Sequence, residues 1–379
     1  MRHDSSVRRL LISLALAASS CSNPSTPPIS AGDPLAHELP AASALVKSVP
    51  ERAMVLRLSP DGTRAAYLAQ ASKDPALDSR LEGFALFVDG PGGREQLSDA
   101  IFDAWFATPP AWRPDGTMLA VVCAPSDEFG VAETTLGVAA PGGHRLEPRF
   151  TITPGSICRS TPAWSPDGER IAIAENSNTG TSLCVLDPQG RLIVRHDIPS
   201  ADYGNGQCSW SSDGKQLALV ACQRLYLFEL LDAAPRTVAT ISYPDSDAAT
   251  PPIWIEQENA LVFGAGKAAW RVEIASGKVT RLFGARPIVD VVQCAGSTLY
   301  LGLEESEVDP RGLGKVAKAV ETLASAGHPR KHWLRLPVLL DPHTNREREL
   351  DSLASESTEI TLTRDASLPV VVRQALASY

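Results

Sequence analysis

Short, nearly continuous runs of apolar residues recur along the chain, and the same polar turn introduces each run. At residues 164–168 the turn reads Trp-Ser-Pro-Asp-Gly, and the apolar run that follows at residues 171–174 reads Ile-Ala-Ile-Ala. Such a run is typical of a strand that is buried on both faces. Similar units begin at residues 58–62, 112–116 and 210–214. The pattern therefore predicts an all-β fold built from a repeated hairpin.

Each residue of the turn has a physical role. Proline presets φ near −65°, aspartate bonds to nearby backbone, and glycine accepts a positive φ. Structural roles are therefore expected for two repeated sets of residues. The aspartates should shape turns rather than catalyse acid–base chemistry, and these are Asp61, Asp115, Asp167 and Asp213. The tryptophans at the start of the units should lie in the core, and these are Trp112, Trp164, Trp210 and Trp254.

A second hairpin follows in most units, for example at residues 182–194 and 269–282, so each unit has four short strands. Four strands make one blade of a β-propeller. Weaker copies of the turn stand at residues 254–258, 292–296 and 362–366. Successive units are mostly about 40–55 residues apart, which is a propeller-like period. We expect seven blades, with residues 42–49 closing the ring, or six blades if the last unit merges with the first.

The alternation of large and small residues at 171–174 predicts how blades pack. Large side chains can fill the gap to one neighbouring blade, while small side chains let the other neighbour approach.

The run Trp-Ser-Pro-Asp-Gly, followed by a basic residue and an Ile-Ala or Leu-Ala pair, resembles the TolB-type propeller repeat, a relative of the WD repeat. The resemblance covers roughly residues 50–379 and implies a β-propeller of four-stranded blades over residues 42–379. TolB itself carries a further globular domain before its propeller. Only about thirty polar residues separate Cys21 from the first unit, so TolB's own role does not carry over.

The first residues form an export signal. A basic head (Arg2, Arg8 and Arg9) precedes a short apolar centre and a run of small residues that ends at Cys21, as in a secretory signal. The stretch resembles the lipobox of bacterial lipoproteins. The resemblance implies that residues 1–20 are removed and that Cys21 is acylated, and Ser22 is permissive for the outer membrane. Ordinary secretion with a free Cys21 is the alternative. Residues 21–41 would form a flexible tether.

Charge and composition narrow the class of partner. The chain has 379 residues, 35 basic and 44 acidic side chains and a net charge of −9. The lack of a basic block argues against a nucleic-acid groove. No apolar stretch reaches the eighteen residues of a membrane-spanning helix. We therefore expect an exported protein that faces the periplasm or the cell surface and meets the membrane through its N-terminal lipid.

Seven cysteines are an odd number for an exported protein. Lipidation of Cys21 leaves six, and an oxidising compartment permits disulfides among them. The positions of the cysteines in the repeat favour the pairs Cys123–Cys158 and Cys208–Cys222. Cys184 and Cys294 would then be free buried thiols.

No local active-site motif is found. The chain has no Gly-x-Ser-x-Gly elbow, no His-Glu-x-x-His pair and no phosphate-binding Gly-x-x-x-x-Gly-Lys run. Pro329 argues against a helix that would bring His328 and His332 together as metal ligands. We therefore expect no catalytic, cofactor-binding or metal-binding residues and no cofactor.

One insertion departs from the repeat at residues 304–332, where a blade normally turns from its second to its third strand. Helical spacing of apolar residues at 313–326 ends at Gly327. A basic and aromatic segment follows, and it is a candidate binding loop because loops on rigid scaffolds often carry function. This segment is Arg330, Lys331, His332 and Trp333. The alternative is a helix that only packs on the rim of the blade.

Together these features favour a lipid-anchored, monomeric propeller that serves as a non-enzymatic binding scaffold for an envelope protein or peptide. The rival is a polysaccharide lyase or glycosidase whose residues come singly from several blades at the channel mouth. Converging His, Arg, Lys and carboxylates at that mouth would favour the enzyme, and small or apolar residues would favour binding. A quinone- or metal-dependent dehydrogenase propeller has no supporting residues.

Overall fold

The computed structural model describes residues 54–70, 84–98, 108–123, 126–127, 130–131, 133–154, 156–177, 179–199, 206–229, 236–241, 249–284, 288–294, 297–307, 333–340 and 347–348. Within these ranges no helix is long and apolar enough to cross a membrane. The signal at residues 1–20, the tether and Cys21 lie outside the described residues.

Antiparallel sheets follow one another along the chain, and each is completed before the next begins. The first contains β1 (Met54–Leu58), β2 (Ala65–Gln70), β3 (Phe84–Gly90) and β4 (Gly93–Gln96). The second contains β5 (Ala111–Trp112), β6 (Leu119–Cys123), β9 (Thr135–Ala140) and β10 (His144–Thr151), and the hairpin of β7 (Ser126–Asp127) and β8 (Gly130–Val131) interrupts it. In the third, β11 (Ile157–Cys158) and β12 (Ala163–Trp164) both pair with β13 (Ile171–Ser177), which β14 (Gly180–Leu186) and β15 (Leu192–Pro199) follow.

The later sheets repeat the same order. The fourth contains β16 (Gln207–Trp210), β17 (Leu217–Ala221), β18 (Arg224–Phe228) and β19 (Arg236–Thr240). The fifth contains β20 (Ile253–Ile255), a 3₁₀ turn at Glu256–Glu258, β21 (Ala260–Ala265), β22 (Ala268–Glu273) and β23 (Val279–Leu282). The last described sheet contains β24 (Ile288–Cys294), β25 (Ser297–Glu307), β26 (Trp333–Leu340) and β27 (Glu347–Arg348).

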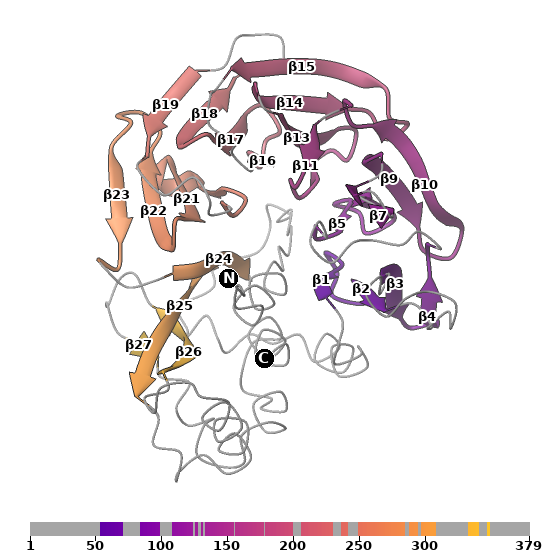
Figure 1. Cartoon of the computed structure of the whole chain (residues 1–379), viewed down its shortest axis with the longest axis horizontal. Coiled ribbons are helices and arrows are strands. Elements are labelled where there is room, and N and C mark those ends of the chain that lie inside the picture. Colours follow the sequence, from indigo (N-terminus) through magenta and orange to yellow (C-terminus); the bar gives the residue numbers. More distant parts are fainter. Residues whose placement is uncertain are drawn as a thin grey trace.

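The sheets are arranged around a common axis. Figure 1 shows the first strand of each sheet on the inner side of the ring and the fourth strand on the outer side. The fold is therefore a β-propeller of four-stranded blades, which confirms the predicted fold class. The turn at residues 362–366 and the closing segment 42–49 lie outside the described residues, so the number of blades stays a prediction.

The repeated turn has the hydrogen bonds that its residue types predict. In the third blade, Gly168 N donates to Ser165 O at 2.8 Å, and Glu169 N donates to the Asp167 carboxylate at 3.0 Å. Gly168 has a φ of +72°, which a residue with a side chain rarely adopts. The other three aspartates likewise accept the backbone N–H two residues ahead. All four aspartates therefore have the structural role expected of them.

Hydrogen bonds in the turn also set the charge state of the aspartate. Burial alone would raise the pKa of the Asp167 carboxyl, but hydrogen bonds from Ser165 and Glu169 and the charge of Arg170 outweigh it. The net result is a pKa below the usual value. The carboxylate is thus held ionised as a hydrogen-bond acceptor within the turn.

The tryptophans join each blade to the one before it. Trp112, Trp164 and Trp210 are buried, as predicted, while Trp254 is half-buried. The indole Nε1 of Trp164 donates to Ala111 O at 3.0 Å, and that of Trp210 donates to Ala163 O at 3.0 Å. Both acceptors lie on the inner strand of the preceding blade.

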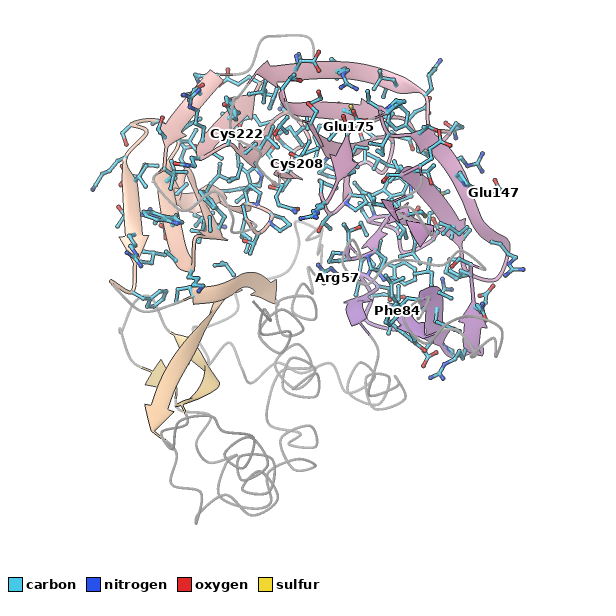
Figure 2. All side chains as sticks on the ribbon, in the orientation of Figure 1. Arg57, Phe84, Glu147, Glu175, Cys208 and Cys222 are labelled. Atoms are coloured by element: carbon cyan, nitrogen blue, oxygen red, sulfur yellow. The ribbon has the colours of Figure 1, made fainter. Side chains whose placement is uncertain are left out.

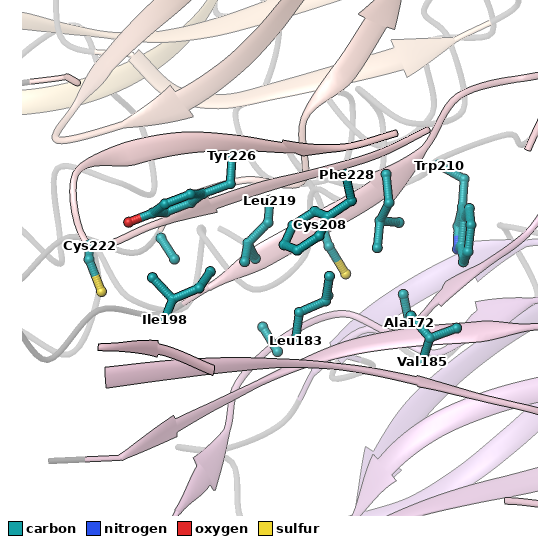
Figure 3. Close-up of a cluster of buried hydrophobic side chains, with 13 residues drawn as sticks. Ala172, Leu183, Val185, Ile198, Cys208, Trp210, Leu219, Cys222, Tyr226 and Phe228 are labelled. Carbon is teal, nitrogen blue, oxygen red and sulfur yellow. The ribbon is translucent and has the colours of Figure 1, made fainter. Parts of the chain in front are cut away.

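The alternation in β13 packs the third blade between its neighbours. Ile171 and Ile173 lie in one buried cluster with Ala120 and Val122 of the second blade. Ala172 and Ala174 lie in another cluster with Leu217, Leu219 and Trp210 of the fourth blade. Figure 3 shows this second cluster, in which Ala172, Leu183 and Val185 lie opposite Leu219 and Phe228. The large residues of β13 therefore fill the gap to one neighbouring blade, and its alanines face the other neighbour, as the sequence predicted.

Pairing in the last described sheet corrects the predicted start of the insertion, because residues 304–307 belong to β25 and pair with residues 333–336 of β26. Glu307 at the end of β25 pairs with Trp333 at the start of β26. The insertion therefore joins the second strand to the third. Its predicted helix at residues 313–326 lies outside the described residues.

Replacing Ile173 with alanine is expected to lower the free energy of unfolding by about 2–5 kcal/mol, since it leaves a cavity between two blades. Ile193→Ala is the matched control, because it removes the same atoms from a residue that is 47% exposed. That change should stay within about 0.5 kcal/mol. Urea unfolding followed by tryptophan fluorescence measures both variants. Equal losses would show that Ile173 is not packed between blades.

Candidate functional site

Most of the sequence-predicted site residues cannot be placed in the ring. Cys21, Arg330, Lys331 and His332 lie outside the described residues, as do His328 and the apolar helix pattern before it. Trp333 is described through its backbone as the first residue of β26. The candidate binding loop therefore remains an expectation at the end of a described hairpin.

The predicted disulfides are wrong. Five cysteines have described side chains, and all five are free and buried: Cys123, Cys158, Cys184, Cys208 and Cys222. Cys294 is described through its backbone alone, as the last residue of β24. Cys208 pairs with Leu219 across β16 and β17, and Cys222 lies three residues beyond Leu219. Three residues of strand span about 10 Å, whereas bridged cysteines need Cα atoms roughly 4.4–6.8 Å apart. Cys123 pairs with Thr135 of β9 in the second blade, and Cys158 pairs with Glu175 of β13 in the third blade. The two cysteines therefore lie in different blades.

Burial makes four of these thiols unreactive. Burial raises the pKa of Cys123, Cys184 and Cys208 to about 12, and it raises that of Cys158 as well. A thiol rather than a thiolate is present at neutral pH, and the thiolate is the nucleophile. Cys184 is a free buried thiol, as expected. Among the described residues, no three His, Cys, Asp or Glu side chains are grouped to hold a metal ion.

A shorter repeat lies at the start of the inner strands, and sequence reasoning missed it. Three blades carry a hydroxyl residue, then proline two positions later and tryptophan two further on. The segments are residues 108–112 (Thr-Pro-Pro-Ala-Trp), 160–164 (Ser-Thr-Pro-Ala-Trp) and 250–254 (Thr-Pro-Pro-Ile-Trp). We call residues 108–110, 159–162, 206–207 and 249–252 the inner rim.

Prolines suit these positions because an inner strand has a partner strand on one side only. Its other edge faces the axis of the ring, and proline places no unpaired N–H there. The hydroxyls differ between blades. Thr250 Oγ1 accepts a hydrogen bond from Gly264 N at 2.9 Å, and Ser160 Oγ donates to Thr161 O at 3.1 Å. In the described part of the chain, the buried Thr108 Oγ1 has no hydrogen-bond partner.

A wide bulge shapes the inner rim of the third blade. Cys158 pairs with Glu175 and Ala163 with Ala172, so residues 159–162 stand opposite only residues 173–174. Gln207 of the fourth blade fastens this bulge. Its Nε2 donates to Arg159 O at 3.0 Å, and its Oε1 accepts from Thr161 N at 3.1 Å. The extra residues between Cys158 and Trp164 were the one sequence signal of this bulge.

An ion pair with a buried carboxylate lies next to Cys158, the last paired residue before the bulge. The side chain of Glu175 is buried and accepts from Arg195 Nη1 at 2.8 Å and from Thr153 Oγ1 at 2.8 Å. Arg195 also donates to Ser182 at 2.7 Å and to Asp197 at 2.9 Å. Thr153 follows β10 of the second blade, so the carboxylate joins two blades. Because the Glu175 carboxylate already accepts these hydrogen bonds, its role is structural. Figure 2 labels Glu175 in the third blade.

The described part of the rim carries no acid–base pair. Its described side chains are hydroxyls, prolines, the Gln207 amide and the Arg159 guanidinium. The polar side chains that the rim leaves partly exposed are Arg159, Thr161 and Thr250, since Thr108, Ser160 and Gln207 are buried. Groups of this kind, held by a fixed backbone, can bind a polar chain.

The comparison with curated proteins finds a relative over about half of the chain. No protein-family model matches the chain. Over 194 residues the chain is 31% identical to the uncharacterized peptidase YuxL of Bacillus subtilis (strain 168), a match that covers 51% of this chain and 27% of that protein. The match thus spans about a quarter of the length of YuxL. The peptidase activity in that name refers to YuxL.

Solved propellers are similar in fold alone. An oligogalacturonate lyase in complex with manganese matches with a TM-score of 0.48 at 12% identity, over 79% of this chain and 76% of that one. The β-propeller domain of the Trilobed protease from Pyrococcus furiosus matches at 0.46 and 12%, over 67% and 78%. TolB from Acinetobacter baumannii matches at 0.38 and 13%, over 60% and 53%.

The five described thiols should resist alkylation by iodoacetamide at neutral pH in the folded protein, and all should react in urea. Burial is the reason, since it blocks access to all five thiols and raises the pKa of Cys123, Cys158, Cys184 and Cys208. Mass spectrometry of tryptic peptides, without reduction, measures the modification of each cysteine. A disulfide-linked peptide, or rapid labelling of Cys184 in the folded chain, would contradict the structure.

Proposed function

We propose that this protein is a lipid-anchored envelope β-propeller that binds a protein or peptide, without catalysis, at the inner rim. The observation that carries the proposal is the bulge at residues 159–162, which Gln207 holds in place through both ends of its amide. β-Bulges often lie next to functional sites, where they redirect side chains. Here the bulge presents Arg159 and Thr161 at the inner edge of the ring.

Strand direction supports a shared binding face. In each blade the second strand runs antiparallel to the first, so it ends where the inner strand begins. The chain leaves β25 at Glu307 and re-enters at Trp333 on that side of the ring. The insertion with Arg330, Lys331, His332 and Trp333 therefore departs from the face that carries the inner rim. The Pro-Asp-Gly turns lie on the opposite face.

The relative favours a peptide over a glycan as the ligand. YuxL is named a peptidase, and the 31% identity covers half of this chain. Hydroxyl and guanidinium groups such as those of Thr161 and Arg159 can form hydrogen bonds with the backbone carbonyls and carboxylates of a polypeptide. The rival remains a lyase or glycosidase that acts on an envelope polysaccharide.

A photo-crosslinking amino acid at Thr161 should capture a discrete envelope protein in cells. The same residue at Thr117, an exposed position in a Pro-Asp-Gly turn on the opposite face, is the matched control and should capture none. Gel shifts and mass spectrometry identify the adducts. Equal adducts at both positions, or none at Thr161, would contradict the proposed site. Release of new sugar ends from envelope polysaccharide by the purified protein would establish the enzyme instead.

Cys21→Ser should abolish incorporation of labelled palmitate and leave the protein in the soluble fraction, because no lipid then holds the tether. Ser22→Asp should keep the label but move the protein to the inner membrane, as the resemblance to lipoproteins implies. Fractionation of the envelope, with blotting, measures both. An unchanged membrane distribution of Cys21→Ser would contradict the lipid anchor.

A further inference from the structure

The outer edge of the third blade differs from the other described outer edges. β15 has eight residues and no proline before its last position, whereas the equally long β10 carries Pro148 in its middle. β4, β19 and β23 have only four or five residues. Short strands and proline are the usual protection against pairing with another chain. Among the described residues, β15 is therefore the longest outer strand without an internal proline, and Figure 1 shows it on the outside of the ring.

The start of this strand carries exposed apolar side chains. Leu192 is 42% exposed and Ile193 is 47% exposed, and they are the exposed large apolar residues of the described chain. Val185 pairs with Val194 and Leu186 with Leu192, so Ile193 is the extra residue of a bulge. The bulge turns a β-branched side chain toward solvent, where burial against a partner would be favourable.

The turn before the strand is rigid. Asp187 accepts hydrogen bonds from Gln189 N at 3.1 Å and Arg191 N at 2.8 Å. Gly190 has a φ of +86°, and a Cβ there would lie 2.0 Å from the Arg149 carbonyl oxygen of β10. This close approach seats the turn on the second blade, so little conformational freedom would be lost on binding.

Arginines border the apolar pair. Arg191 donates from Nε to Asp187 at 3.0 Å and its side chain is 83% exposed, so its two terminal amino groups face solvent. Arg149 lies against Gly190 of the turn and pairs with Glu147 at 2.6 Å, and Figure 2 places Glu147 on the outer margin of the ring. A carboxylate can take both terminal nitrogens of one guanidinium. The cations contrast with the net charge of −9 of the whole chain.

We propose that β15 is a docking edge for an extended segment of a partner protein, added as a further strand, with apolar side chains next to acidic ones. The apolar side chains cover Leu192 and Ile193, and a carboxylate pairs with Arg191. Main-chain hydrogen bonds to the free edge supply the remaining affinity. This surface lies on the outside of the ring and does not depend on the inner rim.

The probe is an acetylated octapeptide of alternating glutamate and valine, added to the full-length protein. Hydrogen exchange of residues 192–199 should slow about tenfold when the peptide is in tenfold excess over its dissociation constant. An octapeptide with lysine in place of glutamate should have no effect. Protection by both peptides, by neither, or at other strands would overturn the proposal. Protection of β15 that depends on protein concentration alone would also overturn it, in favour of a second copy of the chain.

Variants separate the docking edge from general stability. Ile193→Ala and Arg191→Gln should each weaken the protection at least threefold while urea unfolding stays unchanged. The matched control is Arg236→Gln, because Arg236 begins β19, the outer strand of the next blade. That variant should bind the peptide like the parent. Unchanged binding of both β15 variants, or equal weakening by Arg236→Gln, would overturn the proposal, whatever the crosslinking at Thr161 shows.

Discussion

The indole N–H of each repeat tryptophan holds the ring together. A buried N–H must find an acceptor, and for Trp164 and Trp210 that acceptor is a backbone carbonyl on the inner strand of the preceding blade. The same bond from Trp112 reaches Arg57 O at 3.0 Å. Arginines of the turn add to it, since Arg113 Nε donates to Gly168 O at 3.0 Å and the Arg170 guanidinium lies 4.8 Å from the Trp210 ring centre. One repeated side chain therefore fixes how successive blades are oriented.

The contacts between blades lie in the core and on the face with the Pro-Asp-Gly turns. The opposite face can therefore differ from blade to blade without breaking these contacts. The Pro-Asp-Gly turns carry the arginine contacts between blades. On the opposite face the inner strands begin and the hairpin of the last described blade carries its insertion. The bulge at residues 159–162 is fastened across blades by Gln207. The bulge is therefore held by contacts between two blades rather than by its own strand alone.

The cysteines show where reasoning from the repeat stopped. The even number of cysteines left after Cys21, and their positions near strand ends, predicted disulfides. Cys158 and Cys208, however, lie on inner strands with buried neighbours, and Cys222 lies in a tight turn after β17. Cys222 and Gln223 both have positive φ, which directs the Cys222 thiol toward Thr181 at 3.5 Å. Pairing depends on distances across blades, and positions in a repeat do not supply those distances. Burial keeps oxidants and other thiols away from each of these free cysteines.

The sequence by itself determined the four-stranded repeat, the turn aspartates, the buried tryptophans and the alternation of Ile and Ala in β13, because each depends on residues within one hairpin. It also located the insertion between the second and third strands of its blade. Only the tertiary structure decided the state of the thiols, the clamp of Gln207 on the bulge, the Glu175–Arg195 pair and the exposed start of β15. These features depend on which side chains of separate blades meet, and that is set by the ring rather than by any local pattern.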